Sequence, residues 1–456
     1  MKERWKRIKG YDSYEVSEEI INCFPEYELV IGNDNKVHNM YRGEDLGLGG
    51  WVMTKPGMYG PTALLDVASL HPSSIILMNK LGDYTKNYAD LRNARVFIKH
   101  KDYDSVKKLF NGKLAKYLES EEEADTLSTA LKLPINAFYG VGTAKFENPA
   151  KDSRDINNIV ALRGALFMKT LVDAVEEQGF NVIHVKTDSL KIENPTDEII
   201  KFAQDFAKKY GYELEHECTY DRICLINKAC YIAKYDDKGI RNKGGKHANE
   251  WTATAAEFAH PYIFKTCFSH EQIEFSDYCE TKSVKGKLYL DMNDGLPDVS
   301  YWERIKENRK RDASKLTKKA VAEIFDTRDM TDEQIDAEIA KGHNYIFIGR
   351  ISQFVPVVDE AHGGELVVKR DGKFSAVAGT KGYRWLEATA VKSLGLEHLI
   401  DKSYYRKLVD DAIEDIAQYG DYEWFANAPV GSRMNDEDDK EREWFQEVIK
   451  DPDIPF

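Results

Sequence analysis

Two aspartates stand at the ends of strand-like segments, where their carboxylates could hold a divalent cation. In NVIHVKTDSLKIEN, residues 181–194, two β-rich runs flank a polar centre, which predicts a hairpin with Asp188 at its turn. Asp66 ends a strand predicted over 62–67 and precedes a helix predicted over 73–81, with Pro72 close to its first position. Mg²⁺ takes one or two carboxylates beside substrate phosphates. The alternative is that Asp188 occupies a surface turn and that Asp66 only caps one.

Groups suited to a triphosphate accompany these carboxylates. Free backbone N–H groups near Ser69, Leu70 and His71, at the start of the predicted helix, can hold phosphate oxygens. A second helix is predicted over 125–140, where the spacing puts Lys132, Asn136 and Tyr139 on one face. Such a lysine could meet phosphates and such a tyrosine could stack on a base pair, although Pro134 is expected to kink the helix. The alternative is an amphipathic helix with a solvated lysine.

The composition of the chain limits the class of protein to which these residues can belong. With 456 residues, 42% hydrophobic and 31% charged, the chain can bury several cores and is expected to be soluble and cytoplasmic. Its basic start is not followed by an apolar segment, and no apolar run is long enough to span a membrane. The six cysteines show no CxxC pairing, so reduced thiols are expected. A net charge of −14 argues against a nucleic-acid coat protein but not against a nucleic-acid enzyme.

Four motifs carry a resemblance to a known family. DVASLHPSSI (66–75) is similar to the motif DxxSLYPSII, KLPINAFYG (132–140) to KxxxNSxYG, and VKTDSL (185–190) to YGDTDS. CLINKACYIA (224–233) resembles the lysine-to-tyrosine motif that contacts the primer end, with Lys228 and Tyr231 as the matching residues. The order and separations of these motifs resemble those of family-B DNA polymerases, especially the phage members. Residues 344–424, including GTKGYRWLE, look like the C-terminal part of phage polymerases.

The resemblance implies an α+β right-hand polymerase: a palm with an antiparallel sheet, helical fingers and a thumb. It implies two Mg²⁺ ions, replaceable by Mn²⁺, held by Asp66, Val67 and Asp188. The primer 3′-hydroxyl would attack the α-phosphate of a dNTP in template-directed DNA synthesis during phage replication. Lys132 and the amides near 69–71 would bind the triphosphate, while Asn136 and Tyr139 would shape the base-pair pocket. Thr187, Lys228 and Tyr231 would meet the primer.

Further basic residues extend the predicted substrate and DNA contacts. Lys113 and Lys116 are expected on a fingers helix that precedes residue 125, where they could add charge near the triphosphate. The glycine-rich loop 239–247 and a basic helix predicted over 301–325 could grip the DNA backbone sequence-independently. Their candidate phosphate contacts are Arg241, Lys243, Lys246, Arg309, Lys310 and Arg311. The alternatives are a mobile surface loop and a solvated helical face.

The predicted domains follow the motif order: lead-in segment 1–59, palm 60–85 and 141–235, fingers 86–140, palm–thumb connection 236–300, thumb and C-terminal region 301–428, and acidic tail 429–456. A palm helix is predicted over 196–210, strands over 344–378 with a turn at 370–373, and helices around 383–394 and 402–418. The terminal Asp453, Ile454, Pro455 and Phe456 resemble the tail tip of bacterial single-stranded-DNA-binding proteins, which suggests recruitment of host replication proteins in the host cytoplasm.

Four departures from the family pattern keep other functions open. Lys186 replaces the first aspartate of the third motif, His71 replaces the tyrosine that excludes a ribose 2′-hydroxyl, and Ala137 replaces a serine. No Asp-x-Glu exonuclease motif precedes residue 60, so any proofreading would be on a separate exonuclease chain or absent. One alternative is a non-catalytic relative that binds primer–template DNA. Another is a primase-like nucleotidyltransferase with relaxed sugar selection.

Overall fold

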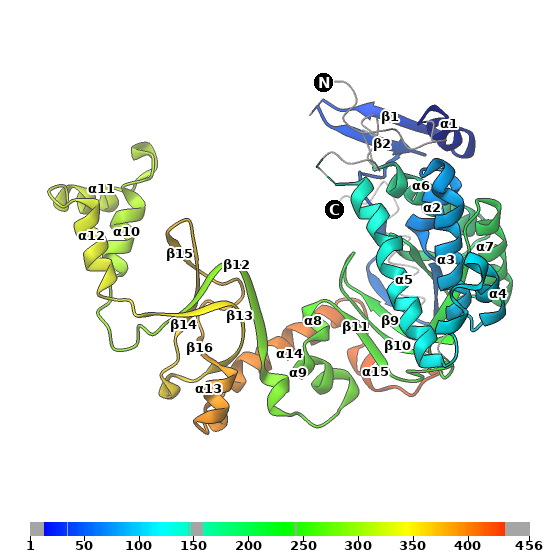
Figure 1. Cartoon of the computed structure of the whole chain (residues 1–456). Coiled ribbons are helices and arrows are strands. Elements are labelled where there is room, and N and C mark those ends of the chain that lie inside the picture. Colours follow the sequence, from blue (N-terminus) through cyan, green and yellow to red (C-terminus); the bar gives the residue numbers. More distant parts are fainter. Residues whose placement is uncertain (1–12, 34, 145, 147–157, 242–243, 434–456) are drawn as a thin grey trace, which may run out of the picture. The chain divides into compact units, whose positions relative to one another are not determined.

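The computed structural model describes residues 13–33, 35–144, 146, 158–241 and 244–433. The chain divides into two compact units, Met1–Ala259 with Ile413–Phe456 and His260–Ala412. Each unit combines helices with an antiparallel sheet (Figure 1). This confirms the mixed helix-and-sheet class, and the division into palm, fingers and thumb stays a prediction.

An eight-stranded antiparallel sheet forms the centre of the first unit. Its strand order is β11-β10-β9-β6-β8-β7-β4, with β5 paired to β9. Leu65 and Leu190, on adjacent central strands, are fully buried in the same core as Leu166 of α6 (Ile159–Glu177) and Ile199 of α7 (Asp197–Lys209). The strands are β4 Val52–Thr54, β5 Gly57–Tyr59, β6 Thr62–Val67, β7 Val182–Lys186, β8 Ser189–Glu193, β9 Leu214–Leu225, β10 Tyr231–Tyr235 and β11 Trp251–Thr254.

Helix α7 shows why the sequence pattern was readable in this region. Thr196 caps it by accepting a hydrogen bond from the amide of Ile199, and acidic residues fill the first turn while lysines fill the last. Ile199 is buried, and Phe202 and Phe206 pack against the core. The predicted helix over 196–210 is therefore confirmed, and so are the strand over 62–67 and the hairpin around Asp188.

Helices α2 Leu70–Leu77, α3 Thr85–Lys99, α4 Tyr103–Lys108 and α5 Glu121–Gly142 follow β6. Helix α2 begins three residues earlier than predicted, which puts Pro72 in its first turn. Helix α5 continues through Pro134, and Tyr88 of α3 donates to the carbonyl of Ile135 at 2.9 Å. The fingers helix predicted to carry Lys113 and Lys116 is wrong: left-handed backbone at Phe110 and Asn111 breaks it into short 3-10 turns.

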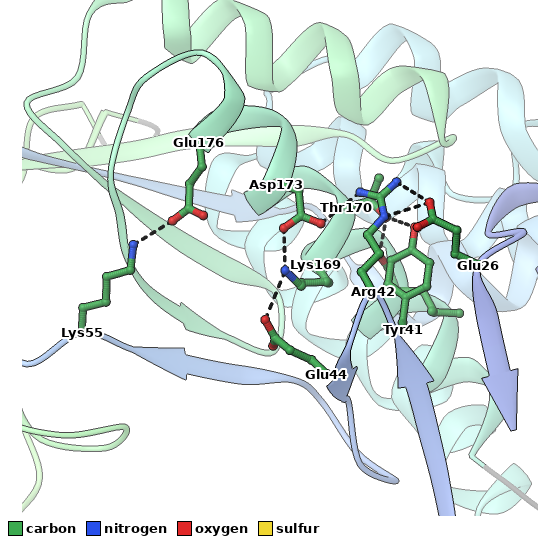
Figure 2. A network of polar contacts seen from close by, with 10 residues as sticks. Glu26, Tyr41, Arg42, Glu44, Lys55, Lys169, Thr170, Asp173 and Glu176 are labelled. Carbon is green, nitrogen blue, oxygen red and sulfur yellow. Dashed lines mark hydrogen bonds and ion pairs between the residues drawn. The ribbon is translucent and has the colours of Figure 1, made fainter. Parts of the chain in front are cut away.

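The N-terminal segment is attached to α6 by charged pairs. It contains α1 Ser13–Cys23 and a small sheet of β1 Tyr27–Ile31, β2 Val37–Tyr41 and β3 Glu44–Asp45. Figure 2 shows Arg42 bridging Glu26 and Asp173, and Lys169 bridging Asp173 and Glu44. The predicted lead-in also contributes β4 and β5 to the large sheet, so strands of this sheet begin before residue 60. Three-residue strands are too short for a period-two pattern to reveal them.

The second unit is built on a five-stranded sheet of order β15-β14-β12-β13-β16. Its core contains Phe354, Trp385 and Tyr405. The turn between β14 and β15 has positive φ at both Asp371 and Gly372, as a type I′ hairpin requires, which confirms the predicted hairpin. The strands are β12 Glu280–Asp291, β13 Tyr345–Val357, β14 Glu365–Arg370, β15 Lys373–Ala376 and β16 Arg384–Glu387.

Helices of the second unit differ in part from the prediction. The single basic helix over 301–325 is wrong: α10 Ser300–Asn308 ends before α11 Lys318–Asp326 begins, and α12 Asp332–Ala340 follows. The helix predicted around 383–394 is wrong in its first half, which forms β16 Arg384–Glu387, and right in its second half, α13 Ala388–Ser393. The helix predicted around 402–418 is confirmed as α14 Lys402–Ala417. The shorter elements are α8 Ala256–Ala259 and α15 Tyr422–Asn427 in the first unit and α9 Pro261–Phe264 in the second.

The expectations about the cysteines and about membrane-spanning segments can be compared with the structure. All six cysteines are free, as expected. Across the described ranges, none of the helices is both long and apolar enough to cross a membrane.

Candidate active site

Strand pairing brings the two predicted carboxylates to one end of the large sheet. Asp66, the penultimate residue of β6, lies opposite Ser189 of β8, and Asp188 immediately precedes β8. The amide of Val67 donates to the carbonyl of Asp188 at 2.7 Å. Asp66 and the turn that carries Asp188 are therefore neighbours, although α2 to α6 separate them in the sequence.

At this end of the sheet, burial and nearby acids disfavour the ionised forms of Asp66 and Asp188 when no counter-ion is bound. Burial raises the pKa of Asp66 to about 7, and repulsion from Asp188, Glu217 and Glu215 contributes, while Lys99 opposes the shift. Burial is also the main cause that raises the pKa of Asp188, with repulsion from Glu217. Glu215 lies opposite Asp66 on β9. A bound cation would offset this desolvation and repulsion.

The donor set suits a cation that takes other ligands from its substrate. Within the ranges that the structure describes, no three His, Cys, Asp or Glu side chains gather as a metal-ligand cluster. Two half-buried carboxylates and open coordination positions fit Mg²⁺, which usually keeps waters and binds substrate phosphates. Lys186 is exposed at the end of β7, so its ammonium is solvated.

The hairpin turn that carries Asp188 is held in an uncommon conformation. Thr187 has φ +59°, which is unfavourable for a β-branched residue. Its amide donates to the carbonyl of Trp51 at 3.0 Å, and the amide of Asp188 donates to the carbonyl of Lys186 at 2.7 Å. A Cβ on Gly50 would lie 2.5 Å from Thr187 Oγ1, so a glycine is needed there. The only sequence signal for this packing was the glycine run before Trp51.

The start of α2 and the end of α5 meet through aromatic rings. The ring centroids of His71 and Tyr139 lie 4.2 Å apart, and burial lowers the pKa of His71, which keeps its imidazole neutral. Asn158, the cap of α6, donates from Nδ2 to the hydroxyl of Tyr139 at 2.7 Å. Ser69, before α2, has φ +62° and its side chain makes no capping hydrogen bond. Two of the predicted nucleotide-site residues are thus in contact.

The remaining predicted nucleotide contacts occupy the surface of the helical region. Lys132 and Asn136 are exposed on α5. Lys113 is exposed after the broken 3-10 turn, and the ammonium of Lys116 lies 4.8 Å from the ring centroid of Tyr117. Leu70 is buried against α6, so only its backbone can face a ligand.

Three basic residues of α3 were missed by the sequence reasoning. Arg92 Nη2 reaches the carbonyl of Ala68 at 3.5 Å, just after Asp66. Burial lowers the pKa of both Arg92 and Arg95, and the charge of Lys99 acts on Asp66. The spacing of these three residues, three and then four, puts them on one helix face, and that spacing was the available signal.

The predicted primer contacts lie beside the hairpin strands. Lys228 is exposed in the loop between β9 and β10, and Tyr231 begins β10. The ammonium of Lys191, on β8, lies 4.6 Å from the ring centroid of Tyr231. Lys191 was not singled out in the sequence.

Several predicted backbone-phosphate contacts are engaged with neighbouring residues. Arg241 pairs with Asp236 at 3.5 Å and donates to the hydroxyl of Thr219 at 3.1 Å. Arg309 donates to the carbonyl of Met330 at 3.0 Å and pairs with Asp332. Arg311, just after α10, pairs with Glu307 of that helix, whereas Lys246 and Lys310 are exposed. Lys243 and Asp453, Ile454, Pro455 and Phe456 lie outside the described residues.

The expectation that the basic residues of 301–325 form a free face for DNA is wrong for Arg309. Helix α10 packs against α12, so acids at the start of α12 face the basic residues of α10. The guanidinium of Arg309 is therefore used within its own unit.

Fold and site together define a mixed helix-and-sheet protein with a two-carboxylate centre at a sheet end. Over 289 residues, 53% of this chain, the sequence is 32% identical to DNA polymerase II of Escherichia coli strain K12, covering 36% of that protein. Over 247 residues, 47% of this chain, it is 28% identical to DNA polymerase 1 of Sulfolobus acidocaldarius, covering 27% of that protein. The chain is thus homologous to DNA polymerases over about half of its length.

Two further comparisons complete these findings. No protein-family model matches the chain. A structural alignment covers 88% of the chain and 49% of the family B DNA polymerase from the hyperthermophilic archaeon Pyrobaculum calidifontis, with a TM-score of 0.38 and 13% identity. The aligned part spans about a third of the length of the curated relatives or less.

Proposed function

We propose that this protein is a template-directed DNA polymerase that adds deoxynucleotides to a primer 3′ end during phage DNA replication. The observation that carries the proposal is the pairing of β6 with β8, which brings Asp66 and Asp188 to one sheet end. The similarity of about half of the chain to DNA polymerases supports the reaction class.

Asp66 and Asp188 would hold two Mg²⁺ ions, with Val67 as the neighbouring backbone ligand. Such ions supply activation of the primer hydroxyl and charge neutralisation of the phosphates. The protein contribution is then positioning: the strained turn at Thr187 fixes Asp188, and the β6–β8 hydrogen bond fixes its distance from Asp66. The raised pKa of Asp66 couples cation binding to proton release.

Residues of α2, α3 and α5 would receive the incoming nucleotide. The amides of Ser69, Leu70 and His71 and the guanidinium of Arg92 would meet the triphosphate near Asp66. Lys132, Lys113, Lys116, Arg95 and Lys99 would add positive charge from the same helical region.

Selection of the base and the sugar would involve the contact between His71 and Tyr139. The tilted ring contact of His71 and Tyr139 would bound the sugar and base, with Asn136 on the same face of α5 as Tyr139.

The DNA would be held beside the same sheet end. In the first unit Thr187, Lys228 and Tyr231 would meet the primer, and Lys243 and exposed Lys246 would add backbone contacts, together with Arg241 where its partner yields. In the second unit exposed Lys310 would contact the DNA backbone, together with Arg309 and Arg311 where their partners yield. Residues 86–140 would serve as fingers and 301–428 as thumb and C-terminal region. The tail at 453–456 would recruit host replication proteins in the bacterial cytoplasm.

Primer extension on a defined template with Mg²⁺ tests this proposal. Asp188→Ala should lower extension by at least about a hundredfold, because one of two cation-binding carboxylates is lost. Asp237→Ala, at an exposed turn, is the matched control and should extend normally. Equal activity of Asp188→Ala and wild type would remove the carboxylate pair from the chemistry.

The same assay separates the two alternatives that the sequence departures suggest. Lys186 beside the carboxylates favours a non-catalytic primer–template-binding protein, which would bind DNA without extending it. His71 favours a primase-like nucleotidyltransferase, which would incorporate ribonucleotides or start without a primer.

A further inference from the structure

A lysine is buried in the middle of the sheet, two strand positions beyond Ser189. Lys191 on β8 is 3% exposed, and across the described part of the chain no carboxylate lies within ion-pair distance of its ammonium. Burial lowers the pKa of Lys191 to about 8, so it is largely charged at neutral pH. A buried charge is costly unless its hydrogen bonds are put to use.

The contacts of Lys191 form a chain toward the predicted primer segment. Its Nζ donates to Nδ1 of His184, on β7, at 3.0 Å. An ammonium has only donors, so Nδ1 must accept and the proton of the neutral imidazole must sit on Nε2. That Nε2–H faces the carbonyl of Lys228 at 3.3 Å. Because His184 is 1% exposed, water cannot easily replace either partner.

The loop that receives this hydrogen bond is held from its other side as well. Asn227 Oδ1 accepts from the amides of Ala229 and Cys230 at 2.9 and 3.0 Å. The hydroxyl of Thr254, on β11, donates to the carbonyl of Ala229 at 2.8 Å. From the hairpin side, His184 fixes the carbonyl of Lys228, while the Lys228 side chain stays exposed.

We propose that Lys191 and His184 form a positioning pair that fixes the loop of Lys228, and the adjacent ring of Tyr231, relative to the hairpin of Asp188. This inference rests on the proposed polymerase function, in which Lys228 and Tyr231 hold the primer end. Lys191 sets the tautomer of His184, His184 holds the backbone of Lys228, and the Lys191 ammonium packs 4.6 Å from the Tyr231 ring centroid. The pair belongs to the two strands whose turn carries Asp188, so it ties the primer contact to the carboxylate site.

The expected effect on primer binding is tested by steady-state primer extension with Lys191→Met. This substitution keeps the side-chain volume but removes the hydrogen-bond donor. The KM for primer–template should rise about tenfold with a small change in kcat, as expected for the loss of one hydrogen bond to a charged group. Lys169→Met, a lysine on the α6 face that binds Asp173 and Glu44, is the matched control and should leave the KM unchanged.

A double variant distinguishes positioning from general loosening of the sheet. If Lys191 acts in part through Lys228, Lys191→Met should cause a smaller loss in the Lys228→Ala background than in wild type, with the remainder passing through Tyr231. Fully additive losses, or a primer KM that rises equally in Lys169→Met, would overturn the proposal.

The tautomer of His184 gives a readout that does not depend on activity. Nitrogen NMR of the full-length protein should show the Nε2–H form in wild type and a changed tautomer population in Lys191→Met. An Nδ1–H imidazole in wild type would overturn the positioning pair even if the protein extends primers. Failure of wild type to extend, with the expected tautomer present, would instead reject the polymerase proposal.

Discussion

Replacing Asp66 by Asn should stabilise the metal-free protein while removing its proposed activity. Burial and repulsion from Asp188 raise the pKa of Asp66 from 3.8 to about 7 in the folded state. The folded state therefore holds this proton more tightly than the unfolded chain does. The stabilisation from that proton is fully present below pH 3.8 and is lost as the pH rises through about 7. The side-chain amide introduced by Asp66→Asn does not titrate, so it adds no such dependence of stability on pH.

The magnitude follows from the width of that pH window. The full shift corresponds to at most about 4 kcal/mol of unfolding free energy. Solvent access to a half-buried group reduces this, so we expect Asp66→Asn to gain about 1–2 kcal/mol at pH 8.5. At pH 5.5 only about half of the window has been crossed, so the gain should be about half as large.

Thermal unfolding in EDTA at pH 5.5 and 8.5 measures this effect, with Asp237→Asn as the exposed control. Adding Mn²⁺ should raise the melting temperature of wild type more than that of Asp66→Asn, because the cation offsets the same repulsion. The reasoning would be refuted by an Asp66→Asn variant that gains nothing at pH 8.5, or gains as much at pH 5.5.

Three further predictions concern the turn, the sugar site and the C-terminal anchor. Gly50→Ala should lower primer extension by displacing Thr187, whereas Gly49→Ala, whose Cβ would meet no atom within 4 Å, should be neutral in the same assay. His71→Tyr should increase discrimination against ribonucleotides in paired dNTP and rNTP incorporation assays, and identical discrimination would remove His71 from sugar selection. Arg222→Met should lower the unfolding free energy of the first unit by about 3 kcal/mol in a denaturant titration, because the buried guanidinium binds the carbonyls of Phe425 and Ala428; a loss below about 1 kcal/mol would contradict that anchoring role.

Local patterns determined the elements that carry the site. The β-rich runs around residues 187–188 were enough to predict the hairpin, and the cap and apolar spacing around Thr196 were enough for α7. Both signals depend on a few adjacent residues, so no distant contact was needed to form them. The Asp371–Gly372 turn was predictable for the same reason, since both residues tolerate positive φ.

Other features were hidden because their causes are distant in the sequence. The run of basic residues in 301–325 suggested one exposed helix, but packing against α12 broke the segment and occupied Arg309. Strands β4 and β5 are too short to show alternation, and they form only because β7 and β9 offer open edges.

The sequence by itself determined that Asp66 lies near the end of one strand and that Asp188 follows another, because alternation and turn residues are local properties. Only the tertiary structure decided that these strands are neighbours, that Glu215 lies beside them and that Gly50 packs on Thr187. The physical reason is that strand pairing is chosen by burial of the whole sheet against α6 and α7. That choice depends on all the segments at once, and no single stretch of the chain contains it.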